Sequence, residues 1–355
     1  MRHSANLDIL RTLAVSMVII DHLVRTLVTH SGFHCLPVMA FTSHIGHVGV
    51  LAFFVHTSLV LMYSLERMTR SAGRVSLRFY VRRFFRIYPL SVFIIIVVII
   101  FHVPADTFGA VAGGISLRVV FTNLLLVQNI FTKSNVLGPL WSLPYEVQMY
   151  LVLPVLYYLA RKKRAVNYLS GLFVFFCIFG FMLFYRTGHL NMAAYIPCFL
   201  SGVLCYSLRD HIQASVPSAL WPPFVLLLIS GYCLTNIGGD PNYWIGWIFC
   251  LFLGLAINFF RNSANKHLNT VVGRVALYSY GIYLNQILVL YLIFMVLGIK
   301  NIFFGPLLFL VLTMVASFIS YHFIESPFIE LGRKLSSWPV RPPVILSGPD
   351  TLKGD

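Results

Sequence analysis

The chain has little charge for its length. Only 10% of its 355 residues are Asp, Glu, Lys or Arg, and only 11 of them are acidic. A typical soluble domain is about 25% charged, so this composition excludes an ordinary soluble protein. Hydrophobic residues make up 58% of the sequence, and the mean hydropathy is +0.82. These values predict an all-α polytopic membrane protein.

Several common motifs are also absent. The six cysteines are scattered without a CxxC spacing, which argues against both a disulfide framework and a metal site. The sequence contains no GxxxxGK[ST] loop, no GxGxxG and no HExxH. The first apolar run carries charges and is followed by no small-residue cleavage site, so we expect it to be a membrane helix and not a cleaved signal peptide.

Apolar stretches long enough to span a bilayer occur ten times. They cover residues 8–30, 44–65, 87–103, 142–160, 167–186, 191–208, 221–236, 243–260, 274–297 and 303–325. A shorter apolar stretch, Arg118–Phe131, is expected to be a re-entrant or interfacial helix. A full crossing there would move the basic run at 161–164 to the outer side.

Basic residues give a net charge of +15, but they lie between the apolar runs. This distribution indicates membrane topology and no nucleic-acid partner. The basic connections fall on one side of a ten-helix arrangement, so the positive-inside rule predicts that both termini are cytoplasmic. We expect residues 1–332 to form a single transmembrane domain. Residues 333–355, rich in Pro and Ser, are expected to be a disordered cytoplasmic tail.

The first predicted helix carries a polar stripe. Arg11 and His22 are eleven positions apart, which places them within about 20° of each other around a helix. Asp8 and Arg25 fall close to the same stripe. An ionisable residue inside a membrane helix costs a few kcal/mol unless it faces a polar interior, so Arg11 and His22 are candidate functional residues. The alternative is a packing histidine and a snorkelling arginine.

A second candidate site is the stretch SLRFYVRRFFRIYPL, which begins at Ser76. Guanidinium groups bind phosphate bidentately, and aromatic rings can stack on a purine. Arg82, Arg83 and Arg86 are therefore predicted to bind a phosphorylated cofactor that enters from the cytoplasm. Equally compatible with the sequence is a patch that only sets topology and meets anionic lipid.

Two carboxylates complete the candidate set. Glu146 lies one turn from Tyr150 in GPLWSLPYEVQMY, and such a carboxylate can orient a histidine and stabilise its cation. Its alternative role is a water-exposed interface residue. For Glu325, near the end of the last apolar run, two roles are equally compatible with the sequence: a structural lock with one of the arginines of the third predicted helix, and a catalytic part. His56 is a second intramembrane histidine that could share a cavity with His22.

Taken together, these stretches resemble the membrane-bound acyltransferase-3 family of bacteria, which includes glycan O-acetyltransferases. Six pieces match in family order. They are LDILR followed by His22, the GV…FFV run at Gly49–Val55, RRFFRIYP at Arg82–Pro89, WSLPYEVQMY at Trp141–Tyr150, SYGIYL at Ser279–Leu284 and FIESPF at Phe323–Phe328. The resemblance implies about ten helices with cytoplasmic termini, in the cell inner membrane. It also implies transfer of an acyl group, usually acetyl, from cytoplasmic acyl-CoA to an acceptor hydroxyl.

The family's functional residues carry over to His22, Arg11, Arg83–Arg86 and Glu146. The sequence departs from the family pattern at Val147, where a second acidic residue is common, and at Gln286, where a histidine is common. Thr57–Ser58 replaces a serine–glycine pair. These departures concern the acceptor pocket more than the reaction.

The resulting hypothesis is O-acyl transfer without a metal. Acyl-CoA, most simply acetyl-CoA, docks on Arg82, Arg83 and Arg86, and its thioester reaches His22. With an unperturbed pKa of about 6.5, His22 can act as a general base or accept the acyl group, supported by Glu146 and Arg11. The acceptor is a carbohydrate, lipid or other hydroxyl compound of the cell envelope. One rival is a transporter or channel, and another is an acyl-group translocator that feeds a separate extracytoplasmic transferase.

Overall fold

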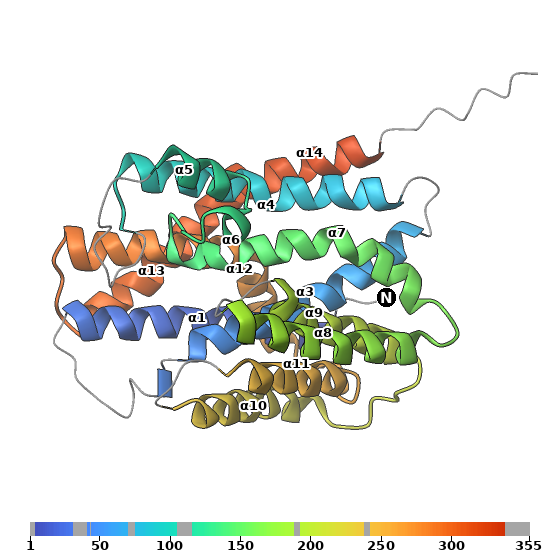
Figure 1. Ribbon diagram of the computed structural model, residues 1–355. Coiled ribbons are helices and arrows are strands. Elements are labelled where there is room, and N and C mark those ends of the chain that lie inside the picture. Colours follow the sequence, from blue (N-terminus) through green and yellow to red (C-terminus); the bar gives the residue numbers. More distant parts are fainter. Residues whose placement is uncertain are drawn as a thin grey trace, which may run out of the picture.

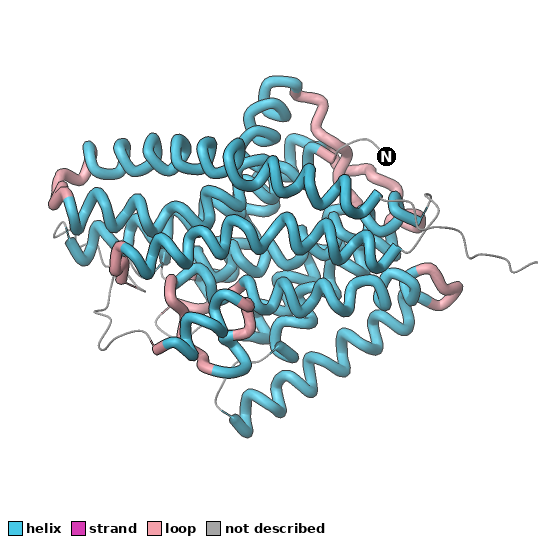
Figure 2. Tube along the Cα trace, turned by 90° about the horizontal axis from the view of Figure 1, so that it is seen from above, coloured by secondary structure: helices cyan, strands magenta, loops and turns pink. Residues whose placement is uncertain are grey.

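The computed structural model describes residues 4–30, 41–42, 44–69, 75–104, 116–187, 192–237 and 242–337. Over these ranges the chain is helical, and its only β pairing is an isolated bridge between Val216 and Phe260. The long helices form one bundle, and most of them run along a common direction (Figures 1 and 2). The prediction of an all-α fold is confirmed.

Over the described residues, ten long helices overlap the ten predicted ranges, although the helix over 87–103 begins twelve residues earlier, at Val75, because the basic stretch before it is helical as well. These are α1 (Ala5–His30), α3 (Ile45–Thr69), α4 (Val75–Ile100), α7 (Leu143–Ala160), α8 (Ala165–Thr187), α9 (Met192–Leu208), α10 (Trp221–Thr235), α11 (Tyr243–Ile257), α12 (Lys266–Leu290) and α13 (Phe304–Ser320). Two of them continue as π-helical turns, α12 through Tyr291–Val296 and α13 through Tyr321–Glu325. The second turn leads directly into α14 (Ser326–Ser337).

Six helical segments in the described ranges are long and apolar enough to cross a membrane. They contain α3, α4, α8, α10, α12 and α13, whereas α9 and α11 are apolar but shorter. Large apolar side chains are exposed along α8 and α13, for example Phe175, Ile178 and Phe318, as expected for surfaces that face lipid. The total of ten spans and the side on which the termini lie stay predictions.

From residue 116 to α7, the described part of the segment before α7 does not form a crossing helix. It contains α5 (Leu117–Leu124), α6 (Gln128–Phe131) and a 3-10 turn at Gly138–Trp141. The eight residues of α5 rise only about 12 Å, well short of a bilayer core. The prediction that this segment does not span is therefore supported. At the other end of the chain, α14 makes residues 333–337 of the predicted tail helical, and residues 338–355 lie outside the described ranges.

Close helix crossings hold the centre of the bundle together. A side chain at Gly202 of α9 would clash with the Ser58 hydroxyl and the Val55 carbonyl of α3. A Cβ at Gly254 of α11 would come within 2.6 Å of the Ser201 carbonyl oxygen of α9. Small residues of this kind let membrane helices approach closely and gain dispersion contacts. The helices α3, α9 and α11 therefore form a tight inner group.

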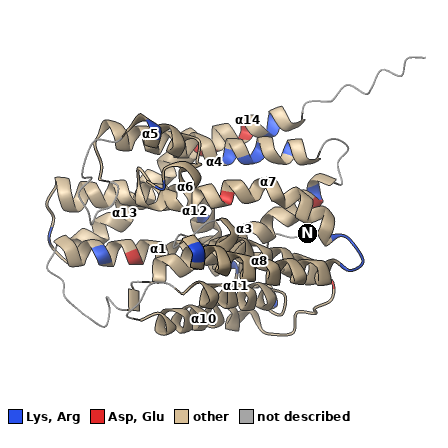
Figure 3. Cartoon of the chain, in the orientation of Figure 1, with Lys and Arg blue, Asp and Glu red and all other residues tan. Residues whose placement is uncertain are grey.

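The basic residues gather toward one end of the bundle (Figure 3). At this end α1 and α4 begin, and α14 ends (Figure 1). Side-chain bonds tie several connections together there, because Asn6 of α1 donates to the Arg261 carbonyl at 2.9 Å and its own carbonyl accepts from Trp221 at 2.9 Å. This charged end is the one predicted to face the cytoplasm.

Candidate functional site

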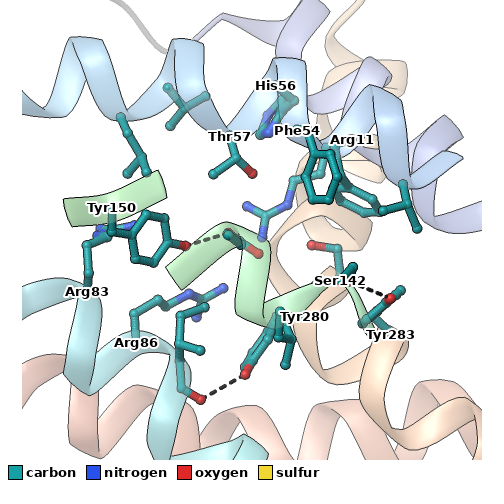
Figure 4. A pocket seen from close by; sticks show the side chains of 18 residues that line it. Arg11, Phe54, His56, Thr57, Arg83, Arg86, Ser142, Tyr150, Tyr280 and Tyr283 are labelled. Atoms are coloured by element: carbon teal, nitrogen blue, oxygen red, sulfur yellow. Dashed lines mark hydrogen bonds between the residues drawn. The ribbon is translucent and has the colours of Figure 1, made fainter. Parts of the chain in front are cut away.

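A cavity of about 110 Å³, here called the inner cavity, lies where five helices meet (Figure 4). Helices α1, α3, α4, α7 and α12 supply its walls. Its polar lining includes Arg11, His56, Arg83, Arg86, Glu146, Tyr150 and Tyr280. Four of the six residues predicted as site residues, Arg11, Arg83, Arg86 and Glu146, are thus brought together from distant parts of the sequence.

Glu146 lies near three arginines. The Tyr150 hydroxyl, one turn along α7, donates a hydrogen bond to its carboxylate, and Arg11, Arg83 and Arg86 provide the neighbouring positive charges. The Nε atoms of Arg11 and Arg83 are buried and have no hydrogen-bond partner among the described residues. Because unpaired buried charges are costly, the carboxylate of Glu146 stabilises this cluster while leaving donors of both arginines free.

Arg86 has a second carboxylate partner. Its Nη1 lies 2.7 Å from Oε2 of Glu325, whose side chain is fully buried. The guanidinium also lies 5.7 Å from the centre of the Tyr280 ring, and the hydroxyl of Tyr280 donates to the Ile87 carbonyl at 2.8 Å. The predicted lock between Glu325 and an arginine is confirmed. It fastens α4 to the turn that joins α13 and α14.

His22 occupies a different place. It lies eleven residues beyond Arg11 on α1, which is about 16 Å along the helix axis, and it does not line the inner cavity. Gln286 of α12 lies beside it. Nδ1 of His22 and Oε1 of Gln286 are both buried without a hydrogen-bond partner in the described ranges.

Two expectations about His22 are therefore not supported. Glu146 interacts with Tyr150 and arginines, so the structure does not bring it to the histidine. His56 lines the inner cavity, so it does not share a cavity with His22. The physical reason is the length of α1: residues on one stripe share a face, but they can lie at opposite depths in a bilayer.

Arg82 faces away from the inner cavity. Its Nε donates to the Ser336 hydroxyl of α14 at 2.8 Å, and Arg82 lines a recess near the start of α4. A larger cavity of about 510 Å³ lies toward the charged end and includes Asp8, Arg67 and Arg209 in its lining. This cavity adjoins the inner cavity, because Arg11, His56 and Val60 line both.

Some residues at the site were not identified from the sequence. Tyr280 contacts Arg86, as described above, and Tyr283 donates to the Pro139 carbonyl at 2.7 Å and bonds the Ser142 hydroxyl at 2.8 Å. These bonds fix the start of α7 and so position Glu146. The SYGIYL piece that contains both tyrosines was a usable signal. Within the described ranges, no group of His, Cys, Asp or Glu has the arrangement of a metal site.

The fold and the cavity define an all-helical membrane protein with a buried cluster of arginines and carboxylates. Comparison with known proteins gives the family. The acyltransferase 3 family, described as an acyltransferase domain, matches residues 4–322, and the chain belongs to this family.

The chain is also similar to acyltransferase MdmB of Streptomyces mycarofaciens. The two are 35% identical over 124 residues, which cover 33% of this chain and 30% of that protein. The match thus spans under one third of the curated relative's length. No solved structure matches the chain significantly.

Proposed function

We propose that the protein is an integral membrane O-acyltransferase. It moves an acyl group, acetyl in the simplest case, from cytoplasmic acyl-CoA to a hydroxyl group of a glycan, lipid or other acceptor. The observation that carries this proposal is the inner cavity. In a chain of the acyltransferase 3 family, Arg11, Arg83, Arg86 and Glu146 line one cavity. We place the protein in the inner membrane, with ten spans and both termini in the cytoplasm.

The donor enters from the charged end. The large cavity and the inner cavity adjoin, so an extended acyl-CoA can pass from one to the other. The Nε atoms of Arg11 and Arg83 have no hydrogen-bond partner among the described residues. We assign these two arginines to the binding of polar groups of acyl-CoA inside the bundle. Glu146 balances the charge of these arginines.

His22 acts on the acceptor. As a neutral imidazole it takes the proton of the acceptor hydroxyl while the hydroxyl oxygen attacks the thioester carbonyl. The carbon–sulfur bond then breaks, and the CoA thiolate takes up a proton and leaves as the thiol. Gln286, beside His22, can accept an N–H bond from the imidazole and fix its tautomer. In the alternative route, His22 itself carries the acyl group before the acceptor takes it.

The test is a thiol-release assay on purified protein with acetyl-CoA and candidate acceptors. We expect wild-type protein to release CoA and to acylate one of these acceptors. Failure to bind or consume acetyl-CoA would favour a transporter or channel. Release of CoA with the acyl group delivered only to a second protein would identify an acyl-group translocator. Mass spectrometry of surface glycans and lipids, with and without the gene, would identify the acceptor.

A further inference from the structure

A recess of about 270 Å³ lies between the end of α3 and the start of α4. It is lined by Ser64, Arg67 and Met68 of α3 and by Arg78 and Arg82 of α4. The α3 residues recur at helical spacing, as do the two α4 arginines, so each helix turns one face toward the recess. Three arginines thus line a small space, and no carboxylate is among the described residues that line it.

The recess differs electrostatically from its surroundings. Arg67 and Arg78 make no ion pair and no hydrogen bond with any described residue, and Arg82 bonds only the neutral Ser336 hydroxyl. Arg209, which lines the adjacent large cavity, lies 3.3 Å from Asp210 and 3.8 Å from Glu66. Like charges one helical turn apart repel each other. A bound anion would relieve this repulsion between Arg78 and Arg82.

The recess is also connected to the rest of the site. Arg67 lines both the recess and the large cavity, and the large cavity adjoins the inner cavity at Arg11 and His56. A ligand with its phosphates in the recess can therefore extend into the bundle. Guanidinium groups match phosphate oxygens in geometry as well as in charge.

We infer that Arg67, Arg78 and Arg82 bind the phosphate groups at the nucleotide end of acyl-CoA. Arg83 and Arg86 serve a different purpose deeper in the bundle, where Glu146 and Glu325 neutralise them. This inference rests on the proposed function and adds Arg67 and Arg78 to the donor site. Compared with the phosphate site predicted from the sequence, the inferred site extends about 12 Å along α4 toward its start, the axial rise from Arg86 back to Arg78.

Two acyl donors distinguish binding of the nucleotide from binding of the thioester. Acetyl-CoA carries the phosphates, whereas acetyl-pantetheine has the same thioester and arm without the nucleotide. In the double variant Arg67→Ala/Arg78→Ala, we expect the ratio of kcat/KM for acetyl-CoA to that for acetyl-pantetheine to fall about tenfold or more, the value of one charged hydrogen bond. The matched control is Lys162→Ala/Lys163→Ala, which removes two exposed charges from the α7–α8 connection and should leave the ratio unchanged.

Binding of adenosine 3′,5′-bisphosphate to the purified protein is the second measurement. It should weaken in the double variant and in high salt. An unchanged ratio with unchanged bisphosphate affinity would overturn the inference. Loss only of binding to vesicles that contain phosphatidylglycerol would also overturn it and assign the recess to a lipid headgroup. If wild-type protein transferred no acyl group but bound the bisphosphate through these arginines, the nucleotide site would stand and the proposed function would fail.

Discussion

Two pairs of arginines on α4 differ in what surrounds them. Arg78 and Arg82, near the start of the helix, line a recess with no carboxylate among the described residues that line it. Arg83 and Arg86, deeper in the bundle, lie beside Glu146 and Glu325. One basic stretch thus supplies two environments, and partner carboxylates decide which arginines stay available for an anionic ligand. A cluster of arginines in a sequence does not by itself identify a phosphate site.

Arg83 and Arg86, the deeper pair of α4 arginines, depend on Glu146. Removing the charge of Glu146 should have the largest effect on activity. In Glu146→Gln the arginines lose a nearby counter-charge, so we expect acyl transfer to fall about 100-fold or more. Tyr150→Phe removes one hydrogen bond but keeps the carboxylate, and its loss should be clearly smaller. Steady-state kinetics at matched amounts of folded protein measure both. Equal losses in the two variants would contradict a charge-balancing role.

The lock between Arg86 and Glu325 should dominate stability. Glu325→Ala leaves Arg86 partly buried without this partner, which should lower the free energy of unfolding by about 3–5 kcal/mol. Glu325→Gln keeps a hydrogen-bond acceptor and should cost less. Thermal unfolding in detergent compares the two with wild type. If Glu325→Ala were as stable as wild type, the deeper pair would not need its carboxylates.

A packing variant at a site away from both arginine pairs gives a reference for thermal stability. Gly202→Ala places a methyl group against Ser58 and Val55, and overpacking of this kind costs about 1–3 kcal/mol. We therefore expect a smaller fall in thermal stability than for Glu325→Ala, with an unchanged KM for acetyl-CoA. A change in KM would mean that the α3–α9 crossing also shapes the donor path.

The smallest effect is expected from labelling variants, which test whether both arginine pairs approach the cytoplasm. A cysteine at Lys163 lies at the charged end of the bundle, and one at Lys300 lies in the connection before α13. An impermeant thiol reagent applied outside should label the second and not the first, and neither change should affect activity. The reverse pattern would invert the topology and separate the arginines from cytoplasmic acyl-CoA.

The sequence predicted a helix in each of the ten apolar ranges, because apolar length is a strong and local signal, but it missed the first twelve residues of α4, which are basic and amphipathic. It also predicted the pairing of Glu325 with an arginine and the contact of Tyr150 with Glu146. The second contact follows from helical spacing alone. The first depends on where α13 packs, and it was inferred from the positions of charges near one membrane surface.

The partners of His22 could not be predicted. The stripe on α1 gives the angle around the helix axis between His22 and Arg11. The depth at which α7 packs decides whether Glu146 lies near His22 or near Arg11. Gln286 was noticed only as a departure from the family pattern, and its place beside His22 depends on the packing of α12 against α1. The difference between the two pairs of α4 arginines could not be predicted either, because it depends on where carboxylates from other helices pack.

The most direct test of the account is acyl transfer by folded His22→Gln at matched protein level. Glutamine keeps much of the volume and some hydrogen bonding of histidine but cannot take a proton near neutral pH. We predict that this variant binds acetyl-CoA like wild type, because the arginines proposed to hold the donor lie on α1, α3 and α4 away from His22, and that it transfers no acyl group. Transfer near the wild-type rate would make His22 a packing residue and would contradict the proposed mechanism.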